Sequence, residues 1–548
     1  MFRNWFAPRP RGRGCRLRVE WLEDRAVPSF TFTVNTTLDD MTPGDGKLSL
    51  RKAIMAANAR PGLDTIVLPA GLYKIALDGA AEDLNATGDF DVTDRLVIQG
   101  AGAGMTVVDA QQKDRVFDLH GSIGVLFSGL TLRRGVQAAT GGGAIRAGAA
   151  NVTLVNCVVS DSLGGDGGGI NAVSGNVTLV GTAVVRNVAE QSGGGISLGS
   201  GMLTLSGSTV RRNWSGTQGG GISANGAVVL TNSAVGGNHA AGAGGGIVAG
   251  TATLTASAVG GNSAIGDGGG IFAVEATLTG SMVGGNTSRK NGGGVLAIAV
   301  VTLTSSTVGG NHSIGEGGGI SCDTVTVANS NVSSNAAGDA GGGIVAVRAT
   351  LTRCTVSGNS AGGPGGGIWT TTAFLTNCTI SDNTSSDAGG GLFASVGTVL
   401  NCTIADNLAL NGGGIFFDPA VTGETLRLRN TIVALNSAPA FDVRDVSGDM
   451  VSDGHNLIGD GTGSPGFVNG ISGDIVGTRA NPIDPRLGPL AMNGGPTRTM
   501  ALLAGSLAID RGDNASLPPS DQRGAGFARK KDGNGDHVEV ADIGAFEL

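Results

Sequence analysis

The chain contains few aromatic residues, few histidines and no long uninterrupted apolar run. Phe, Trp and Tyr together make up 4% of the 548 residues, and there are five histidines. The longest apolar run, around residues 295–303, is much shorter than the roughly 18 residues that a membrane-spanning helix needs. The sequence therefore predicts no membrane span, and it predicts a core that is closed by aliphatic side chains.

Charge is also sparse. Only 15% of the residues are charged, and the formal net charge is −8. A chain of this kind is neither a nucleic-acid binder by charge nor a disordered polyelectrolyte. We expect an elongated, mildly acidic protein without a nucleic-acid partner.

The cysteines and histidines do not have the spacing of metal ligands. The six cysteines lack the short paired spacing of a zinc site, and the histidines show no metal spacing either. Cys354, Cys378 and Cys402 are each 24 residues apart. We expect them to form a buried column of small thiols. A disulfide between neighbours is the alternative, although parallel side chains in register seldom reach the required dihedral angle.

What the chain has in abundance is glycine, with 99 residues, most visibly in twelve near-identical Gly-Gly-Gly-Ile blocks that recur every 23 to 26 residues. A fixed period in this range indicates a solenoid, in which each unit buries its apolar side by stacking on its neighbours. The blocks end at Ile145, Ile170, Ile196, Ile222, Ile247, Ile271, Val295, Ile320, Ile344, Ile368, Leu392 and Ile415.

Between the glycine blocks lies a second pattern, in which Ser, Thr or Cys precedes Val or Ile by two residues and Asn by five. Short runs of β-branched and small polar residues, interrupted by Gly and Asn, are typical of strands. Three strands and three turns in about 24 residues predict an all-β fold, the right-handed parallel β-helix of the pectin-lyase-like type, with about twelve coils. The Val or Ile positions are expected to stack inside as an aliphatic ladder.

The recurring asparagines are expected to form a structural ladder at a bend. There they would adopt left-handed backbone angles and bond to amide groups of neighbouring coils. The ladder comprises Asn187, Asn213, Asn238, Asn262, Asn286, Asn311, Asn335, Asn359, Asn383 and Asn407.

Four segments are predicted along the chain. Residues 1–29 form a basic arm, either for export or simply disordered, and residues 30–120 form an N-terminal cap. Residues 121–436 form the β-helix, and residues 437–548 form a C-terminal module. Within the cap, an amphipathic helix is expected from Ser49, its N-cap, to Asn58, because it would place Leu50, Ile54 and Ala57 on one side. A solenoid needs such a cap to cover its open end.

Both ends of the chain resemble known modules. The basic arm resembles an N-terminal motif of large extracellular proteins of planctomycete bacteria, on Leu22-Glu23-Asp24-Arg25 and Pro28-Ser29. The cap resembles the CSLREA-type module that precedes β-helices on bacterial surface proteins, on Asp39-Asp40, Pro43-Gly44-Asp45-Gly46, Leu48-Ser49-Leu50-Arg51-Lys52-Ala53-Ile54 and Ala57-Asn58. Leu48 and Lys52 replace the Cys and Glu of that module, so any role of its thiol is absent here.

The repeats and the C-terminal region also resemble known families. The glycine blocks resemble the Gly-Gly-Ala-Ile repeats of chlamydial polymorphic outer-membrane proteins. The end of the chain resembles the choice-of-anchor Q module, on Asn481-Pro482-Ile483-Asp484-Pro485-Arg486-Leu487-Gly488-Pro489-Leu490, Asn493-Gly494-Gly495-Pro496-Thr497, Gly505-Ser506-Leu507-Ala508-Ile509-Asp510-Arg511-Gly512, Asp521-Gln522-Arg523-Gly524 and Asp542-Ile543-Gly544-Ala545-Phe546-Glu547. These resemblances imply an extracellular or cell-surface location.

Two groups of residues are candidates for chemistry. Asp382 and Asp406 stand one coil apart, so stacking would bring their carboxylates to roughly 5 Å, near the separation used by retaining glycosidases. Solvated turn residues are the simpler interpretation. Asp532, Asn534 and Asp536 have the alternating oxygen ligands that open a calcium loop, although the helices and the twelfth-position Glu of an EF-hand are missing. Ordinary turn chemistry is favoured there too, and no other cofactor is predicted.

The sequence thus favours a noncatalytic surface or secreted scaffold, such as an adhesin, whose partner is an envelope or extracellular polysaccharide or a surface protein. The alternative is a secreted polysaccharide lyase or glycoside hydrolase, because fold does not fix function. A purely structural envelope component is the third hypothesis.

Overall fold

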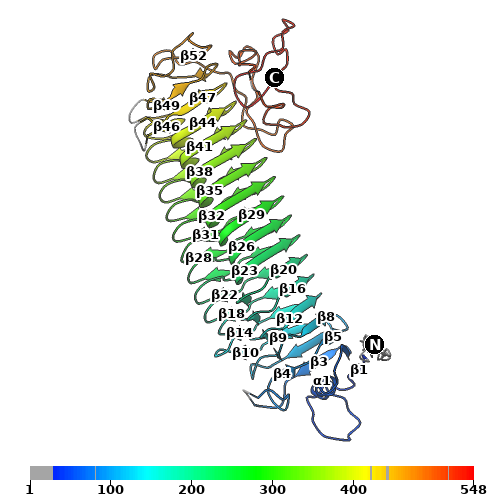
Figure 1. Ribbon diagram of the computed structural model, residues 1–548. Helices are drawn as coiled ribbons and strands as arrows, with labels where there is room; N and C mark the ends of the chain where they lie inside the picture. The colour runs from blue at the N-terminus through cyan, green and yellow to red at the C-terminus, as the bar shows by residue number, and fades with distance from the viewer. Residues whose placement is uncertain (1–28, 80–81, 420–422, 440–442, 516) are drawn as a thin grey trace, which may run out of the picture.

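The computed structural model describes residues 29–79, 82–419, 423–439, 443–515 and 517–548. The predicted export arm, residues 1–29, therefore lies almost entirely outside the described part of the chain. The structure confirms the predicted fold class: it is an all-β parallel solenoid of about 15 turns, a few more than the twelve that the glycine blocks mark. Its coils stack into a rod with β1 (Thr31–Thr33) near one end and β52 (Ile475–Val476) near the other (Figure 1).

One coil shows how the sequence forms the solenoid. Strand β26 (Ile247–Thr255) is followed by β27 (Ala258–Gly260) and β28 (Ser263–Ala264), and each pairs in parallel with its counterpart in the next coil. Inward and outward residues alternate along β26, with Ala252 and Leu254 buried between exposed threonines. Stacking of such coils gives three parallel sheets. Sheet A contains β26, sheet B contains β27 and sheet C contains β28.

Sheet A holds the longest strands. In the first coils each turn contributes two short strands, such as β11 (Ile145–Ala147) and β12 (Asn151–Val155). In the middle of the rod the two merge into one strand per coil. These are β23 (Ile222–Thr231), β26, β29 (Ile271–Thr279), β32 (Val295–Thr304), β35 (Ile320–Ala328), β38 (Ile344–Thr352), β41 (Ile368–Thr376) and β44 (Leu392–Leu400).

Sheets B and C consist of shorter strands. Sheet B runs from β3 (Gly71–Lys74) to β52 (Ile475–Val476), and sheet C runs from β10 (Val136–Gln137) to β43 (Thr384–Ser385). The predicted aliphatic ladder is the inward column of sheet B. Its members are fully buried: Val184, Val210, Val235, Val259, Val283, Val308, Val332, Val356, Ile380 and Ile404.

The asparagine side chains form a continuous hydrogen-bonded ladder inside the rod. Asn213, for example, donates from Nδ2 to the Val184 carbonyl oxygen at 3.1 Å and to Asn238 Oδ1 at 3.0 Å. The left-handed backbone conformation, however, lies one residue earlier than expected, as at Arg212 with φ 55°. The preceding residue makes the bend, so the asparagine is free to point inward and bond along the rod axis.

The three glycines of a block are required for different reasons, as residues 268–270 illustrate. Gly268 has a φ of +66°. A Cβ on Gly269 would lie 2.4 Å from two backbone carbonyl oxygens, and one on Gly270 would lie 2.9 Å from the amide of Asn286. The backbone conformation of the first glycine and the lack of space for a Cβ at the other two therefore account for the triplet.

Helix α1 (Leu50–Asn58) covers the N-terminal end of the rod, as predicted, and it is the only helix in the described part of the chain. The Ser49 hydroxyl accepts the Lys52 N–H at 3.2 Å and caps the helix. Leu50, Ile54 and Ala57 are buried. None of the described helices is long and apolar enough to cross a membrane.

The segments next to the predicted β-helix also contribute parallel strands. Before residue 121, β1 (Thr31–Thr33) pairs with β2 (Asp64–Leu68), and β2 pairs with β5 (Leu96–Gly100). After residue 436, β51 (Leu457–Ile458) pairs with β48 (Ile432–Ala434). This extension accounts for the additional turns.

The end of the chain folds back along sheet B. Gln522 donates to the Cys354 carbonyl oxygen at 3.1 Å, and the Ala545 N–H donates to the Thr403 hydroxyl at 3.0 Å. Ile543 and Phe546 pack into an apolar cluster with Ile432 of β48. The cysteine column lies under this contact, and the cysteines in the described residues are free thiols.

Candidate functional site

An outward column of sheet A is polar over its first coils. Each residue in the column is the direct partner of the next in the parallel register, so adjacent members are about 4.8 Å apart. The column starts on β4 (Phe90–Val92) and β7 (Phe117–Leu119) and continues through β11, β15 (Ile170–Ala172) and β19 (Ile196–Leu198) to β23. Its members are Asp91, Asp118, Arg146, Asn171, Ser197 and Ser223.

At its N-terminal end, this column forms part of a cluster of carboxylates with one imidazole. His120 Nε2 lies 3.0 Å from Asp91 Oδ1, and Asp91 and Asp118 are buried. One ligand atom from each of Asp83, Asp91, Asp118 and His120 can be chosen so that all four lie within 4.8 Å of one another. Oxygen ligands with one imidazole suit a divalent cation such as calcium or manganese better than zinc.

Two guanidinium groups compete for the same carboxylates. Arg115, only 6% exposed, places Nε 2.7 Å from Asp89 Oδ2 and donates from Nη1 to Asp118 Oδ2 at 2.8 Å. Arg146 Nη1 lies 3.1 Å from the same Asp118 oxygen. Asp118 is therefore already paired, and a cation would have to share it with both arginines. The cluster can bind a cation or, through its arginines, an acidic group.

Burial disfavours the charged form of the carboxyl groups in this cluster. Desolvation, reinforced by the charge of Asp114, raises the pKa of Asp89 to about 8 although Arg115 opposes the shift. Burial also raises the pKa values of Asp91 and Asp114. At neutral pH Asp89 therefore still holds its proton.

This protonation predicts a pH-dependent stability. Because the folded state keeps a proton on Asp89 that the unfolded chain loses near pH 4, stability from this group is present below pH 4 and is lost as the pH rises toward 8. We expect wild type to lose on the order of 2 kcal/mol between pH 5 and 8 from this site, and Asp89→Asn to lose less. Thermal melts at both pH values test this, with exposed Asp78→Asn as control. An unchanged pH slope in Asp89→Asn would contradict the assignment.

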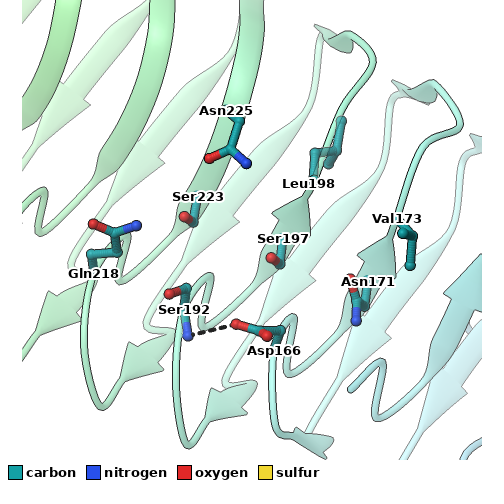
Figure 2. A pocket seen from close by; sticks show the side chains of 10 residues that line it. Asp166, Asn171, Val173, Ser192, Ser197, Leu198, Gln218, Ser223 and Asn225 are labelled. Carbon is teal, nitrogen blue, oxygen red and sulfur yellow. Dashed lines mark hydrogen bonds between the residues drawn. The ribbon is translucent and has the colours of Figure 1, made fainter. Parts of the chain in front are cut away.

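Further along the same column lies a shallow hollow of about 290 Å³ (Figure 2). Its walls are mostly amide and hydroxyl side chains, and Asp166 Oδ1 accepts the Ser192 N–H at 3.0 Å. Asn171 links the hollow to the carboxylate cluster, since its Nδ2 donates to the carbonyl oxygen of Thr140, whose hydroxyl accepts from Arg115. The lining residues are Asp166, Asn171, Val173, Ser192, Ser197, Leu198, Gly199, Gln218, Ser223 and Asn225.

At the far end of the rod the same column becomes aromatic. Trp369, Phe393 and Phe416 are consecutive partners in register. The ring centroids of Trp369 and Phe393 are 6.3 Å apart with planes at 23°, and those of Phe393 and Phe416 are 5.3 Å apart at 20°. The stack is not apparent in the sequence, because the three residues lie 24 and 23 positions apart.

The structure places the predicted carboxylate pair elsewhere. Asp382 and Asp406 follow β42 (Thr379–Ser381) and β45 (Thr403–Ala405) of sheet B, are exposed, and both have a φ of 58°. They are the left-handed residues directly before ladder asparagines. Burial, with Asp382 as the second cause, raises the pKa of Asp406. The pair interacts, but it is separate from the column on sheet A.

The predicted calcium residues form a turn. Asp532 Oδ1 accepts the N–H groups of Gly535 at 2.6 Å and Asp536 at 3.1 Å, and Asn534 Oδ1 accepts the Asp536 N–H at 2.8 Å. Asp536 Oδ1 accepts from Val538 at 2.9 Å. Backbone amides thus occupy the oxygens that calcium would need, and calcium binding at this loop stays a prediction.

A sequence signal for the carboxylate cluster does exist. Phe90-Asp91-Val92 and Phe117-Asp118-Leu119 repeat the same Phe-Asp-aliphatic pattern one coil apart, and His120 follows the second directly. The glycine blocks begin only after these strands, so the repeat alone does not align them. Only the pairing of β4 with β7 places the two aspartates side by side.

Two solved structures are similar to this chain over most of its length. One is a pectate lyase, Pel9A, with 14% identity, coverage of 95% of this chain and 96% of that chain, and a TM-score of 0.23. The other is the A-module of the mannuronan C-5 epimerase AlgE6 of Azotobacter vinelandii, with 14% identity, 78% and 93% coverage, and a TM-score of 0.21. The likeness concerns the β-helix fold alone. No protein-family model matches the chain, and no curated protein matches it.

Proposed function

We propose that this protein is a noncatalytic scaffold of the cell surface or extracellular space, such as an adhesin, that binds polysaccharide along the outer face of sheet A. The polar hollow carries the proposal. Its hydroxyl and amide groups come from successive coils, so hydrogen-bonding groups repeat along the rod axis as sugar hydroxyls repeat along a glycan. A long face with shallow sites suits many weak contacts made together.

The hollow itself offers little for catalysis. Asp166 is its one carboxylate, and a backbone amide already occupies one oxygen of that group. General acid and base catalysis of glycan cleavage requires a second titratable group in reach. Amides and hydroxyls can hold a sugar but cannot replace that group.

The second candidate function is a secreted polysaccharide lyase or glycoside hydrolase, and the carboxylate cluster favours it. His120 and Asp91 form a pair that can move a proton, and Arg115 and Arg146 can hold the carboxylate of an acidic sugar. A cation on Asp91 and Asp118 would add charge stabilisation at the same place.

One experiment separates these functions. Purified protein is incubated with a panel of acidic and neutral polysaccharides, with and without calcium, while pull-down and the release of new chain ends are both measured. We expect retention without new chain ends. The double variant Asn171→Ala, Gln218→Ala should weaken retention about thirtyfold if each of the two residues loses one hydrogen bond that contributes roughly 1 kcal/mol. Asn331→Ala, on sheet B, is the matched control.

The other outcomes decide between the remaining hypotheses. If new chain ends are released by the wild-type protein but not by His120→Gln, the protein is an enzyme that acts at the carboxylate cluster. If their release is lost in Asp382→Asn or Asp406→Asn instead, the chemistry takes place at the carboxylate pair of sheet B. If the protein neither retains nor cleaves any of the polysaccharides, both functions are overturned. A structural role in the envelope is then left.

A further inference from the structure

Another part of the outer face of sheet A carries a regular two-dimensional array of threonines. It is formed by the outward residues near the ends of seven consecutive long strands, β23 to β41. Two columns run side by side here, two residues apart along each strand. One holds Val229, Thr253, Thr277, Thr302, Thr326, Thr350 and Phe374, and the other holds Thr231, Thr255, Thr279, Thr304, Ala328, Thr352 and Thr376. We call these fourteen positions the threonine face.

The array is held rigidly in register. The residue between the two columns is a buried Leu or Val in every coil, as at Leu254, Leu278 and Leu303, each 0% exposed. The residues of one column are direct partners in consecutive parallel strands. Threonine is also stiff at χ1 because it is branched at Cβ. The methyl and hydroxyl groups therefore repeat at fixed positions.

The hydroxyl groups of this face are not engaged by the protein. In the described part of the chain, none of the eleven threonines makes a side-chain hydrogen bond to another residue. The adjoining serine column differs, since the hydroxyls of Ser233 and Ser257 donate to carbonyl oxygens of Thr231 and Thr255 at 2.8 Å. The threonine hydroxyls can therefore form hydrogen bonds with a ligand that binds to this face.

The two columns themselves carry no charge. Neither column contains a charged residue or a histidine between Thr153 and Leu400. Charged residues border the face. Glu275 and Arg348 belong to the flanking column, the Arg348 guanidinium lies 5.2 Å from the centre of the Phe374 ring, and Arg353 directly follows Thr352. The C-terminal region contacts sheet B, and Asn377 and Arg353, the residues directly after Thr376 and Thr352, bond to Ser520 and Thr497 of that region.

We infer that the threonine face binds the surface of ice. Its repeat is about 4.8 Å between coils and about 6.7 Å between columns. These distances are close to the oxygen spacings of the ice lattice along its a and c axes. Hydroxyls that lack protein partners can take positions in a lattice of water, and methyl groups at the same repeat order the water between them. A rigid array loses little conformational entropy on binding.

This inference is independent of the polysaccharide site, which lies in another column of sheet A. The test uses the full chain and measures partition into growing ice and the thermal hysteresis of the melt and freezing points. We expect the wild-type protein to enter ice and shape its crystals. Thr277→Lys, in the middle of the face, should reduce both signals to those of a buffer control, because a charged side chain breaks the array.

The matched control is Thr287→Lys, an exposed threonine of the same coil on β31 (Thr287–Ser288) of sheet C. It should retain full activity. Exclusion of the wild-type protein from ice would overturn the inference, and so would equal losses in both variants. Retention on crystalline cellulose without any effect on ice, abolished by Thr277→Lys, would also overturn it and assign the face to a crystalline glycan.

Discussion

Replacing Asn286 by leucine is expected to lower the free energy of unfolding by about 2–5 kcal/mol. Asn286 is fully buried, and its Nδ2 donates to the Val259 carbonyl oxygen at 3.0 Å and to Asn311 Oδ1 at 2.9 Å. Its Oδ1 accepts the Asn262 N–H at 3.0 Å. Leucine has a similar shape but leaves these buried groups without partners, and such groups cost about 1–3 kcal/mol each.

The effect should spread along the rod, because each coil is stabilised mainly by its two neighbours. The measurement is the midpoint of urea unfolding followed by circular dichroism, compared with Asn331→Leu. Asn331 lies on the outer side of sheet B, and its side chain makes no hydrogen bond in the described part of the structure. Equal midpoints for the two variants would show that the ladder contributes nothing beyond packing.

Replacing Gln522 by leucine is expected to release the end of the chain from sheet B. Gln522 is fully buried; its Nε2 lies 3.1 Å from the Cys354 carbonyl oxygen and 2.9 Å from that of Arg498, and its Oε1 accepts the Thr379 hydroxyl at 2.6 Å. Loss of these bonds should weaken the contact by about 2–4 kcal/mol. Local opening would then expose Arg498 and its neighbours to protease.

Limited trypsin digestion followed by mass spectrometry measures this release. We expect early cleavage within residues 486–531 in the variant while the β-helix stays intact. Gln191→Leu, at an exposed position on an earlier coil, should digest like the wild-type protein. A digestion pattern in Gln522→Leu that matches wild type would mean that the apolar contacts of Ile543 and Phe546 hold the end of the chain by themselves.

Much of the fold could be predicted because the same sequence pattern recurs twelve times. The period indicated a solenoid, the alternation of small polar and β-branched residues indicated strands, and Ser49 marked the start of the helix. The stack nevertheless has about 15 turns, because coils such as that of β2 and β3 lack the glycine block. Their strands pair by register alone, and register does not appear in a local pattern.

The candidate site could be predicted much less well. Asp382 and Asp406 were visible because they fall on the repeat, but their left-handed backbone shows that the turn geometry selects them. Asp91, Asp118 and His120 fall outside the repeat and were missed. The aromatic stack was missed for a related reason, since partners in a β-helix are a whole coil apart in sequence.

The sequence by itself determined the kind of fold, the inward aliphatic and asparagine columns and the helical cap. These follow from periodicity, because one residue type recurs wherever a position has the same burial and the same partners. Only the tertiary structure decided which outward residues meet. Most outward positions are free to vary from coil to coil, so the carboxylate cluster and the polar hollow exist only once the register of parallel strands is fixed. The docking of Gln522 likewise depends on how the end of the chain folds back.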